Sequence, residues 1–209
     1  MYRLSPVKRC QQPRVFAGTV TSLERRKQEL LSFITSDEQE RARKIKRKQQ
    51  RETFLLIRGY LRSVLSPLLN RAPQNIRLAY GTYGKPFINE ECPYQFNVSH
   101  SKDRYLIGVR ANGSIGVDVE CYRTLNSHPM FFHPEEIRYI SKGSGNKIDR
   151  WLWLWTRKEA FGKAIGEGLS ERIVQRSIME DVIAFEGKKY VLRTEEYASF
   201  TQSICIELV

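Results

Sequence analysis

Residues 114–120, SIGVDVE, constrain the fold most because they combine a strand fit for a core with two acids. The apolar residues Ile115, Val117 and Val119 alternate with Gly116, Asp118 and Glu120. Alternate side chains of an extended chain share a face, so Asp118 and Glu120 lie side by side, with about 7 Å between their Cα atoms. Like charges this close cost free energy unless a cation or water stabilises them. We therefore expect one core-facing side and one side suited to a cation.

The dipeptide Asn112-Gly113 lies between this strand and the apolar run YLIGVR at 105–110. Both residues tolerate positive φ, and such a pair between two apolar runs is a strong sequence signal for a β-hairpin. We therefore predict that SIGVDVE is the second arm of an antiparallel hairpin.

The order of the remaining elements predicts the fold class. Residues 14–23 are expected to form a strand that runs into a turn, and further strands are expected at 76–80, 95–101, 181–185, 188–193 and 203–208. Expected helices are two within 32–69, then 133–142 and 147–169. Thr35 or Ser36 is the expected N-cap of the first helix. The pattern of strand, helices and strands occurs twice, which predicts an α+β protein of two similar halves, 1–103 and 104–209, without a clear sequence repeat.

Composition excludes several classes of protein. The chain of 209 residues is 41% hydrophobic and 28% charged, which is typical of a globular protein. Its apolar runs are far shorter than the roughly 20 residues of a membrane span, and MYRLSPVKRC lacks the apolar core of a secretory signal. We expect a cytoplasmic protein that does not bind membranes. The four cysteines form no CxxC pair, and no cysteine pair accompanies His128 and His133, which argues against disulfides and zinc.

The formal net charge of +12 favours polyanions or acidic proteins as partners. Basic residues are dense between Arg41 and Arg51 (RARKIKRKQQR), where they form either a solvated helix face or a binding surface. Nucleic acid, a phosphate-rich small molecule and an acidic protein all remain open at this point.

A second group of charged residues follows on the expected helix 147–169. Trp151, Trp155, Glu159 and Lys163 are four residues apart and share one face. By itself, the Glu159–Lys163 pair is more typical of an ordinary surface ion pair. Together with Asp118 and Glu120, however, Glu159 provides a third carboxylate. Three carboxylates suit Mg²⁺, which prefers oxygen ligands and often shares them with a phosphate that Lys163 would contact.

These segments resemble the signature of the 4′-phosphopantetheinyl transferases of the Sfp (surfactin-synthetase-activating) type, G-[IV]-D-x-E followed by [FW]-[ST]-x-K-E-[AS]-x-x-K. The chain has GVDVE at 116–120 and WTRKEAFGK at 155–163. Upstream, GKP at 84–86 and FNVSHS at 96–101 match two further family elements. The four motifs occur in the family's order and cover residues 84–163.

The resemblance implies a pseudo-twofold monomer that holds coenzyme A between its halves, with Mg²⁺, or Mn²⁺ in its place, on the pyrophosphate. It implies Asp118, Glu120 and Glu159 as metal ligands, although some members replace the second acid by water. It implies coenzyme A contacts at Arg41, Lys85, Pro86, Ser99, His100, Asp118, Glu159 and Lys163. Among these, His100 and Arg41 would hold the ribose 3′-phosphate. A threonine of the family pattern falls at Phe54, next to Thr53.

The implied reaction transfers phosphopantetheine from coenzyme A to a serine of an apo carrier protein and releases adenosine 3′,5′-bisphosphate. Asp118, Glu159 and Lys163 are the implied catalytic residues, with Glu159 or a water accepting the serine proton and Lys163 neutralising the leaving oxygen. Carrier proteins are acidic, which suits the positive net charge. Carriers of fatty acid, polyketide, nonribosomal peptide and lysine pathways all remain open, and we expect the carrier to contact residues 121–146.

Two other functions compete with this interpretation. The basic run and high isoelectric point would suit a nucleic-acid-binding protein, but no helix-turn-helix, zinc finger or aromatic RNP motif accompanies them. A Mg²⁺-dependent phosphohydrolase would use the same carboxylates, with water as the acceptor.

Overall fold

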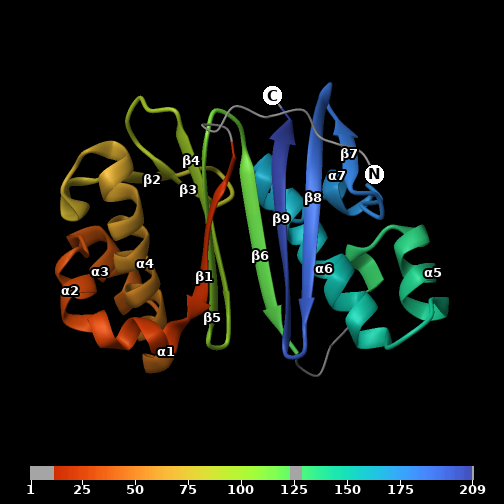
Figure 1. Ribbon diagram of the computed structural model, residues 1–209, viewed down its shortest axis with the longest axis horizontal. Helices are drawn as coiled ribbons and strands as arrows, with labels where there is room; N and C mark the ends of the chain where they lie inside the picture. The colour runs from red at the N-terminus through yellow and green to blue at the C-terminus, as the bar shows by residue number, and fades with distance from the viewer. Residues whose placement is uncertain (1–11, 123–128, 209) are drawn as a thin grey trace.

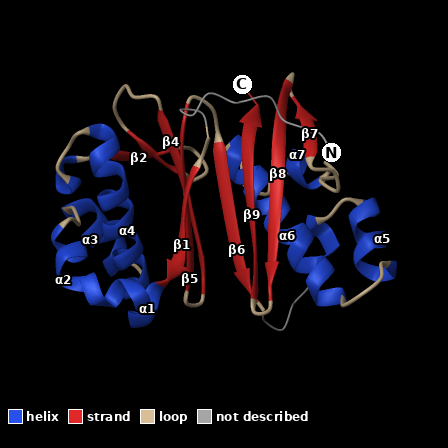
Figure 2. Ribbon diagram, in the orientation of Figure 1, coloured by secondary structure: helices blue, strands red, loops and turns tan. Residues whose placement is uncertain are grey.

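In the computed structural model, which describes residues 12–122 and 129–208, two sheets meet in the middle and helices flank them on both sides (Figures 1 and 2). Helices α1–α4 cover the first sheet, and α5–α7 lie beside the second (Figure 2). The architecture is therefore α+β with two halves, as the element order predicts.

The first half contains a three-stranded antiparallel sheet of order β1-β5-β4 and the small hairpin β2-β3. Its strands are β1 (Arg14–Thr19), β2 (Leu78–Tyr80), β3 (Pro86–Ile88), β4 (Tyr94–Ser101) and β5 (Arg104–Ala111). Its helices are α1 (Val20–Leu23), η2 (Glu24–Arg26), α2 (Lys27–Ser32), α3 (Ser36–Arg43), α4 (Lys48–Leu69) and η3 (Pro73–Asn75).

The second half contains a four-stranded antiparallel sheet of order β6-β9-β8-β7. Its strands are β6 (Ile115–Cys121), β7 (Val182–Phe185), β8 (Lys188–Tyr197) and β9 (Phe200–Leu208). Its helices are η4 (Pro129–Phe131), α5 (Pro134–Lys142), α6 (Lys147–Ile165) and α7 (Glu171–Val174).

Local signals explain where the long helices begin and end. Thr35 and Glu38 form a capping box at the start of α3, so Thr35 is the N-cap. Helix α4 ends at Asn70, whose φ of 49° is left-handed, shortly after Pro67. Helix α6 begins after the side-chain cap of Asn146 and ends at Gly166, with φ of 95°. The two helices predicted within 32–69, and those at 133–142 and 147–169, are confirmed, whereas the short helices between residues 20 and 32 were not predicted.

The predicted hairpin between 105–110 and SIGVDVE is wrong. Asn112 and Gly113 do turn the chain with φ values of 53° and 122°. However, β5 pairs with β1 and β4, and β6 pairs with β9. A Cβ placed on Gly108 of β5 would lie 2.7 Å from side-chain atoms of both Ile115 and Val117, so the two strands meet face to face and not edge to edge.

The assignment of β5 to a half therefore decides where the boundary lies. The predicted division at 103/104 falls in the turn between β4 and β5, whereas β5 belongs to the first sheet and β6 begins the second. The chain passes between the two sheets at residues 112–114. The segment 14–23, predicted as a strand that runs into a turn, is a strand to Thr19 and the helix α1 from Val20.

A small apolar cluster joins the halves. Leu106 of β5 packs there with Ile115, Val117 and Val119 of β6, and each of these side chains is at most 1% exposed. This junction lies between the two larger cores, one under α2 and α4 and one around α6. The apolar face predicted for SIGVDVE is thus confirmed, and its partner is the other half of the protein.

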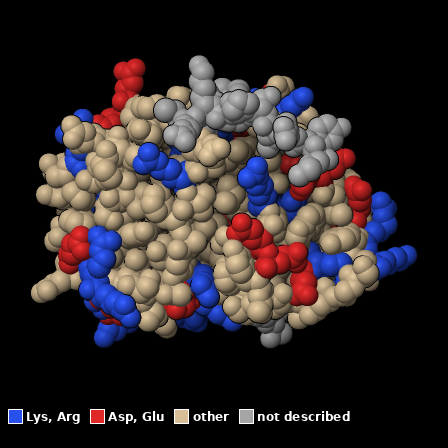
Figure 3. Space-filling view, viewed as in Figure 1, with Lys and Arg blue, Asp and Glu red and all other residues tan. Residues whose placement is uncertain are grey.

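The excess of basic residues does not form one uniform surface. The face in Figure 3 carries both signs, with Lys and Arg along its lower left edge and a group of Asp and Glu over the second sheet. No described helix has both the length and the apolar character that a membrane crossing requires.

Candidate active site

The predicted acid pair lies on the face of β6 that packs against α6. Asp118 is only 3% exposed, whereas Glu120 is half-buried. One oxygen of Asp118, Oδ1, accepts hydrogen bonds from Ser99 and Lys163. The other, Oδ2, is buried without a hydrogen-bond partner. A buried carboxylate oxygen without a partner is costly, which is an indication that this position accommodates a further ligand.

Gly116 is what lets α6 approach the acids closely. A Cβ on Gly116 would lie 2.0 Å from the carbonyl oxygen of Ala160 and 2.4 Å from the amide nitrogen of Ala164. Only glycine fits between the strand and the helix backbone at this distance. Consequently Glu159 and Lys163, on the same helix, are brought next to the acid face of β6.

Lys163 joins the acids from the two elements. Its Nζ lies 2.6 Å from Asp118 Oδ1 and 4.0 Å from Glu159 Oε2. Burial raises the pKa of Glu159, Lys163 lowers it, and the negative charges of Asp118 and Glu120 raise it further, with a net increase. The three carboxylates thus outnumber the one ammonium, and a bound cation would balance the excess negative charge.

The described residues include no group of three or more His, Cys, Asp or Glu side chains that converges as metal ligands do. Asp118, Glu120 and Glu159 are near enough to influence one another electrostatically. In this arrangement, however, Lys163 is the cation at Asp118.

Ser99 faces the acids, whereas the resemblance implies a contact with the nucleotide. Its hydroxyl donates to Asp118 Oδ1 at 2.7 Å and accepts a hydrogen bond from Lys163 Nζ at 3.2 Å. Two residues on, the Ser101 hydroxyl donates to Glu120 Oε2 at 2.7 Å. The sequence predicted no separate role for Ser101 or for Asn97, which alternates with it along the strand. The alternation of polar residues in FNVSHS was the feature that could have indicated such roles.

Lys85 lies between the halves, where its ammonium meets main-chain oxygens. Nζ donates to the carbonyl of Lys163 at 2.6 Å and to that of Ile115 at 3.3 Å. The carbonyl of Lys163 belongs to the last turn of α6, where carbonyls lack intrahelical partners and favour a cation. Burial lowers the pKa of Lys85 to about 8. Lys85 and its neighbour Pro86 line a cavity of about 500 Å³ together with the end of α6.

His100 lies at the surface and lines a different cavity. Desolvation by its neighbours, followed by the charge of Lys163, lowers its pKa. The cavity, of about 690 Å³, lies between the start of α4 and the acid site, because Thr53 and Glu120 line it as well. The threonine next to the family position thus faces the same cavity as His100.

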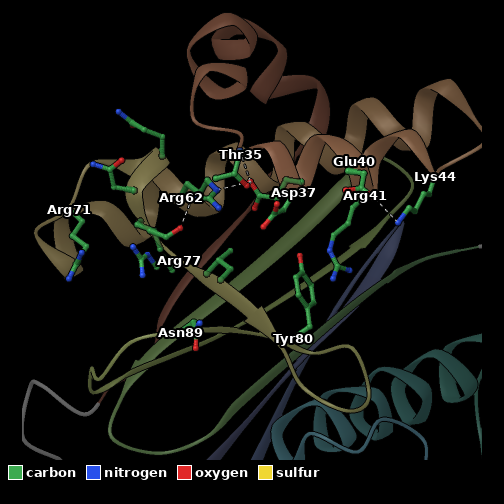
Figure 4. A pocket seen from close by; sticks show the side chains of 15 residues that line it. Thr35, Asp37, Glu40, Arg41, Lys44, Arg62, Arg71, Arg77, Tyr80 and Asn89 are labelled. Carbon is green, nitrogen blue, oxygen red and sulfur yellow. Dashed lines mark hydrogen bonds and ion pairs between the residues drawn. The ribbon is translucent and has the colours of Figure 1, made fainter.

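Arg41 lines a third cavity, of about 990 Å³, within the first half (Figure 4). Its guanidinium lies 3.6 Å from the ring centroid of Tyr80, and the two side chains face each other between α3 and β2. Arg71, Arg77 and Asn89 lie at the far end of this cavity (Figure 4). Arg41 and His100, the implied pair on the 3′-phosphate, therefore line separate cavities.

Comparison with known proteins adds a decisive observation. A family model described as the 4′-phosphopantetheinyl transferase superfamily matches residues 114–205, and a model of the N-terminal part of a 4′-phosphopantetheinyl transferase matches residues 22–111. The first contains the acid strand and α6, and the second contains FNVSHS. The chain belongs to the 4′-phosphopantetheinyl transferase superfamily.

Individual relatives of this superfamily member are also named as 4′-phosphopantetheinyl transferases. A Synechocystis protein provisionally named as a 4′-phosphopantetheinyl transferase is 36% identical over 146 residues, 66% of this chain and 59% of the relative. The transferase HetI of Nostoc is 32% identical over 69% of this chain and 64% of its own length. Sfp of Bacillus subtilis is 31% identical over 67% of this chain and 63% of its own length. The chain thus spans about three fifths of the length of each relative.

The superfamily motif at 155–163 also contains residues that anchor α6. The Lys158 ammonium is fully buried, 2.6 Å from the buried Glu136 carboxylate of α5. It also donates to the carbonyls of Val174 and Arg176 at 3.0 Å. Thr156 binds Ser203 of β9 at 2.8 Å. Trp151 and Trp155 stack with centroids 4.9 Å apart, as expected for one helix face. The buried Lys158 contacts with Glu136, Val174 and Arg176 fix the orientation in which α6 presents Glu159.

Proposed function

We propose that the protein transfers 4′-phosphopantetheine from coenzyme A to a serine of an apo carrier protein, giving the holo carrier and adenosine 3′,5′-bisphosphate. The main support is that Asp118 of β6 lies next to Lys163 and Glu159 of α6. Both family models match the chain. The relatives are named as 4′-phosphopantetheinyl transferases, and the acids of the signature that this sequence resembles are Asp118, Glu120 and Glu159.

The residues fit a divalent cation by their chemistry. Asp118, Glu120 and Glu159 supply the oxygen donors that Mg²⁺ and Mn²⁺ accept, and Asp118 Oδ2 has no other partner. When bound, the ion would offset the negative charge of the pyrophosphate. We propose Asp118, Glu120 and Glu159 as the residues that hold it.

The chain's own groups account for the transfer chemistry. The carrier serine oxygen forms a bond to the phosphorus of the pantetheine phosphate, and the bond from that phosphorus to the bridging oxygen breaks. Glu159 accepts the serine proton, for which its raised pKa suits it. Lys163 offsets the negative charge on the departing oxygen of adenosine 3′,5′-bisphosphate. Positioning and electrostatics thus provide most of the rate acceleration.

The proposed site for coenzyme A lies between the halves. His100 and Thr53 line the cavity beside Glu120, and Arg41 lines the neighbouring cavity of the first half. Lys85 would act there by holding the two halves together and Ser99 by holding Asp118, while Pro86 lines the adjacent cavity. The partner would be an acidic carrier protein approaching a monomer in the cytoplasm, near residues 121–146, of which 123–128 lie outside the described residues.

The test incubates the protein with coenzyme A, Mg²⁺ and several apo carrier proteins and measures the carriers by mass spectrometry. We expect a carrier heavier by one phosphopantetheine group. Unmodified carriers throughout would refute the proposal. Cleavage of coenzyme A without any carrier would instead identify a phosphohydrolase, and salt-sensitive binding of DNA or RNA would support a nucleic-acid-binding protein.

A further inference from the structure

Strand β6 is the edge of its sheet, with β9 on one side. In an antiparallel pair, alternate residues direct their N–H groups to the same neighbour, and an edge strand leaves the other set without a strand partner. For β6 this outward set is Val117, Val119 and Cys121. Buried N–H groups without partners are costly, so this edge requires acceptors from elsewhere.

Side chains of β4 supply those acceptors. The N–H of Val117 donates to Asn97 Oδ1 at 2.9 Å. The N–H of Val119 donates to Ser99 Oγ at 3.4 Å, and that of Cys121 to Ser101 Oγ at 3.2 Å. The partners are 20 residues apart in each case, so the two strands run parallel and side chains replace a backbone ladder.

The two serines make a second contact each. Because each hydroxyl accepts an amide hydrogen, its own hydrogen is directed to the acid that precedes that amide in β6. Ser99 donates to Asp118, and Ser101 donates to Glu120, both at 2.7 Å. Each hydroxyl therefore couples the backbone position of β6 to the orientation of one carboxylate.

We infer that Ser99 and Ser101 are positioning residues that hold the Asp118 and Glu120 carboxylates in the orientation required to bind a divalent cation. The inference rests on the proposed function, since it takes these acids as the ligands. Residues that hydrogen-bond to metal-binding carboxylates orient them and change the metal affinity when they are replaced.

Ser101 gives the sharper test, because Ser99 also contacts Lys163. The change is Ser101→Ala, and Ser101→Thr retains the hydroxyl. The matched control is Ser203→Ala, because Ser203 is fully buried, pairs with Asp118 in the strand register, and bonds to Thr156 and Thr194 instead of an acid. Should the alanine variant not fold, Ser101→Cys keeps the size with a weaker donor.

The experiment measures Mn²⁺ binding to the full chain from the electron paramagnetic resonance signal of free Mn²⁺. Thermal unfolding of each variant is measured in parallel. We expect about tenfold weaker Mn²⁺ binding in Ser101→Ala, near-normal binding in Ser101→Thr, and unchanged binding in Ser203→Ala despite its lower thermal stability.

Equal Mn²⁺ affinity in the wild-type protein and Ser101→Ala would overturn the inference. So would equal weakening in Ser203→Ala, which would mark a general structural effect, or a wild-type protein that binds no Mn²⁺. The carrier assay separates failure of the positioning role from failure of the proposed function. If the wild-type protein modifies the carrier but Ser101→Ala binds Mn²⁺ as tightly as the wild type, only the positioning role is refuted. If the variants show the expected Mn²⁺ affinities but no carrier is modified, only the proposed reaction is refuted.

Discussion

At the scale of single residues, Lys163 is held by acids from two elements, Asp118 on β6 and Glu159 on α6. An ammonium in this position reduces the repulsion between the two carboxylates. The same contacts bring all three groups together at the face where β6 meets α6.

Substitution of these three residues tests their roles separately from the fold. Asp118→Asn and Glu159→Gln keep the side-chain shape and remove the charge. We expect each to lower the initial rate of carrier modification by about 10²–10³-fold, because charge stabilisation is the main contribution. Lys163→Ala is expected to reduce the rate strongly as well. Circular dichroism verifies the fold, and a normal rate in Glu159→Gln would exclude Glu159 as the base.

Sequence reasoning predicted part of this residue-scale picture. Alternation in SIGVDVE placed Asp118 and Glu120 on one face, and helical spacing placed Glu159 beside Lys163. It could not predict what Ser99 touches, because a side chain's partner on another strand depends on how the sheets pack. The same holds for Lys85, whose partners are the carbonyls of Ile115 and Lys163.

At the scale of elements, the contact between β6 and α6 depends on the absence of a side chain at Gly116. Gly116→Ala would place a methyl group against the backbone of α6, which cannot move without displacing Glu159. We expect a loss of about 1–3 kcal/mol in the free energy of unfolding, measured by urea denaturation.

Gly81→Ala is the matched control for that change, because its added Cβ would meet only the Lys85 carbonyl oxygen, at 3.8 Å. We expect its effect to stay within about 0.5 kcal/mol. Equal stability of the two variants would contradict the assigned role of Gly116.

Lys85 gives an element-scale prediction for pH. Its pKa is about 8 in the folded protein, below the ordinary 10.5, so between these pH values the unfolded chain binds more protons. The free energy of unfolding contributed by this residue therefore rises with pH over that window. We expect the stability of the wild-type protein relative to Lys85→Met to increase from pH 8 to 10.5 in urea denaturation. A stability difference that stays constant or falls over this pH range would show that burial does not lower the pKa of Lys85.

The element scale also shows why the hairpin prediction failed. The positive φ values at Asn112 and Gly113 were correctly expected, and so was the strand after them. A turn signal and an alternating pattern define a reversal and a strand, but they do not identify the strand's partner. Here the apolar face of β6 packs across β5, and its backbone pairs with β9, from 79 positions along the chain at Cys121–Phe200 to 91 at Ile115–Ile206.

At the scale of the whole molecule, the junction between the halves predicts how the protein unfolds. All three tryptophans lie on α6 in the second half, so their fluorescence reports that half. Leu106 belongs to the junction and Leu30 to the first core, and both are fully buried.

We expect Leu106→Ala and Leu30→Ala each to lower stability by about 2–5 kcal/mol. Both should shift the urea midpoint of tryptophan fluorescence and of far-ultraviolet circular dichroism together, because the buried junction couples the halves. A Leu30→Ala variant whose tryptophan midpoint is unchanged would show that the halves unfold independently.

The passage of the chain between the sheets at residues 112–114 has a consequence for protein engineering. Every described element before it belongs to one half, and every described element after it to the other. A break at Asn112-Gly113 would therefore sever no strand or helix and would leave each fragment with an exposed apolar face and a set of complementary hydrogen-bonding groups. The molecule is thus suited to conversion into a split reporter, in which two separately expressed fragments regain the acid site only upon reassociation.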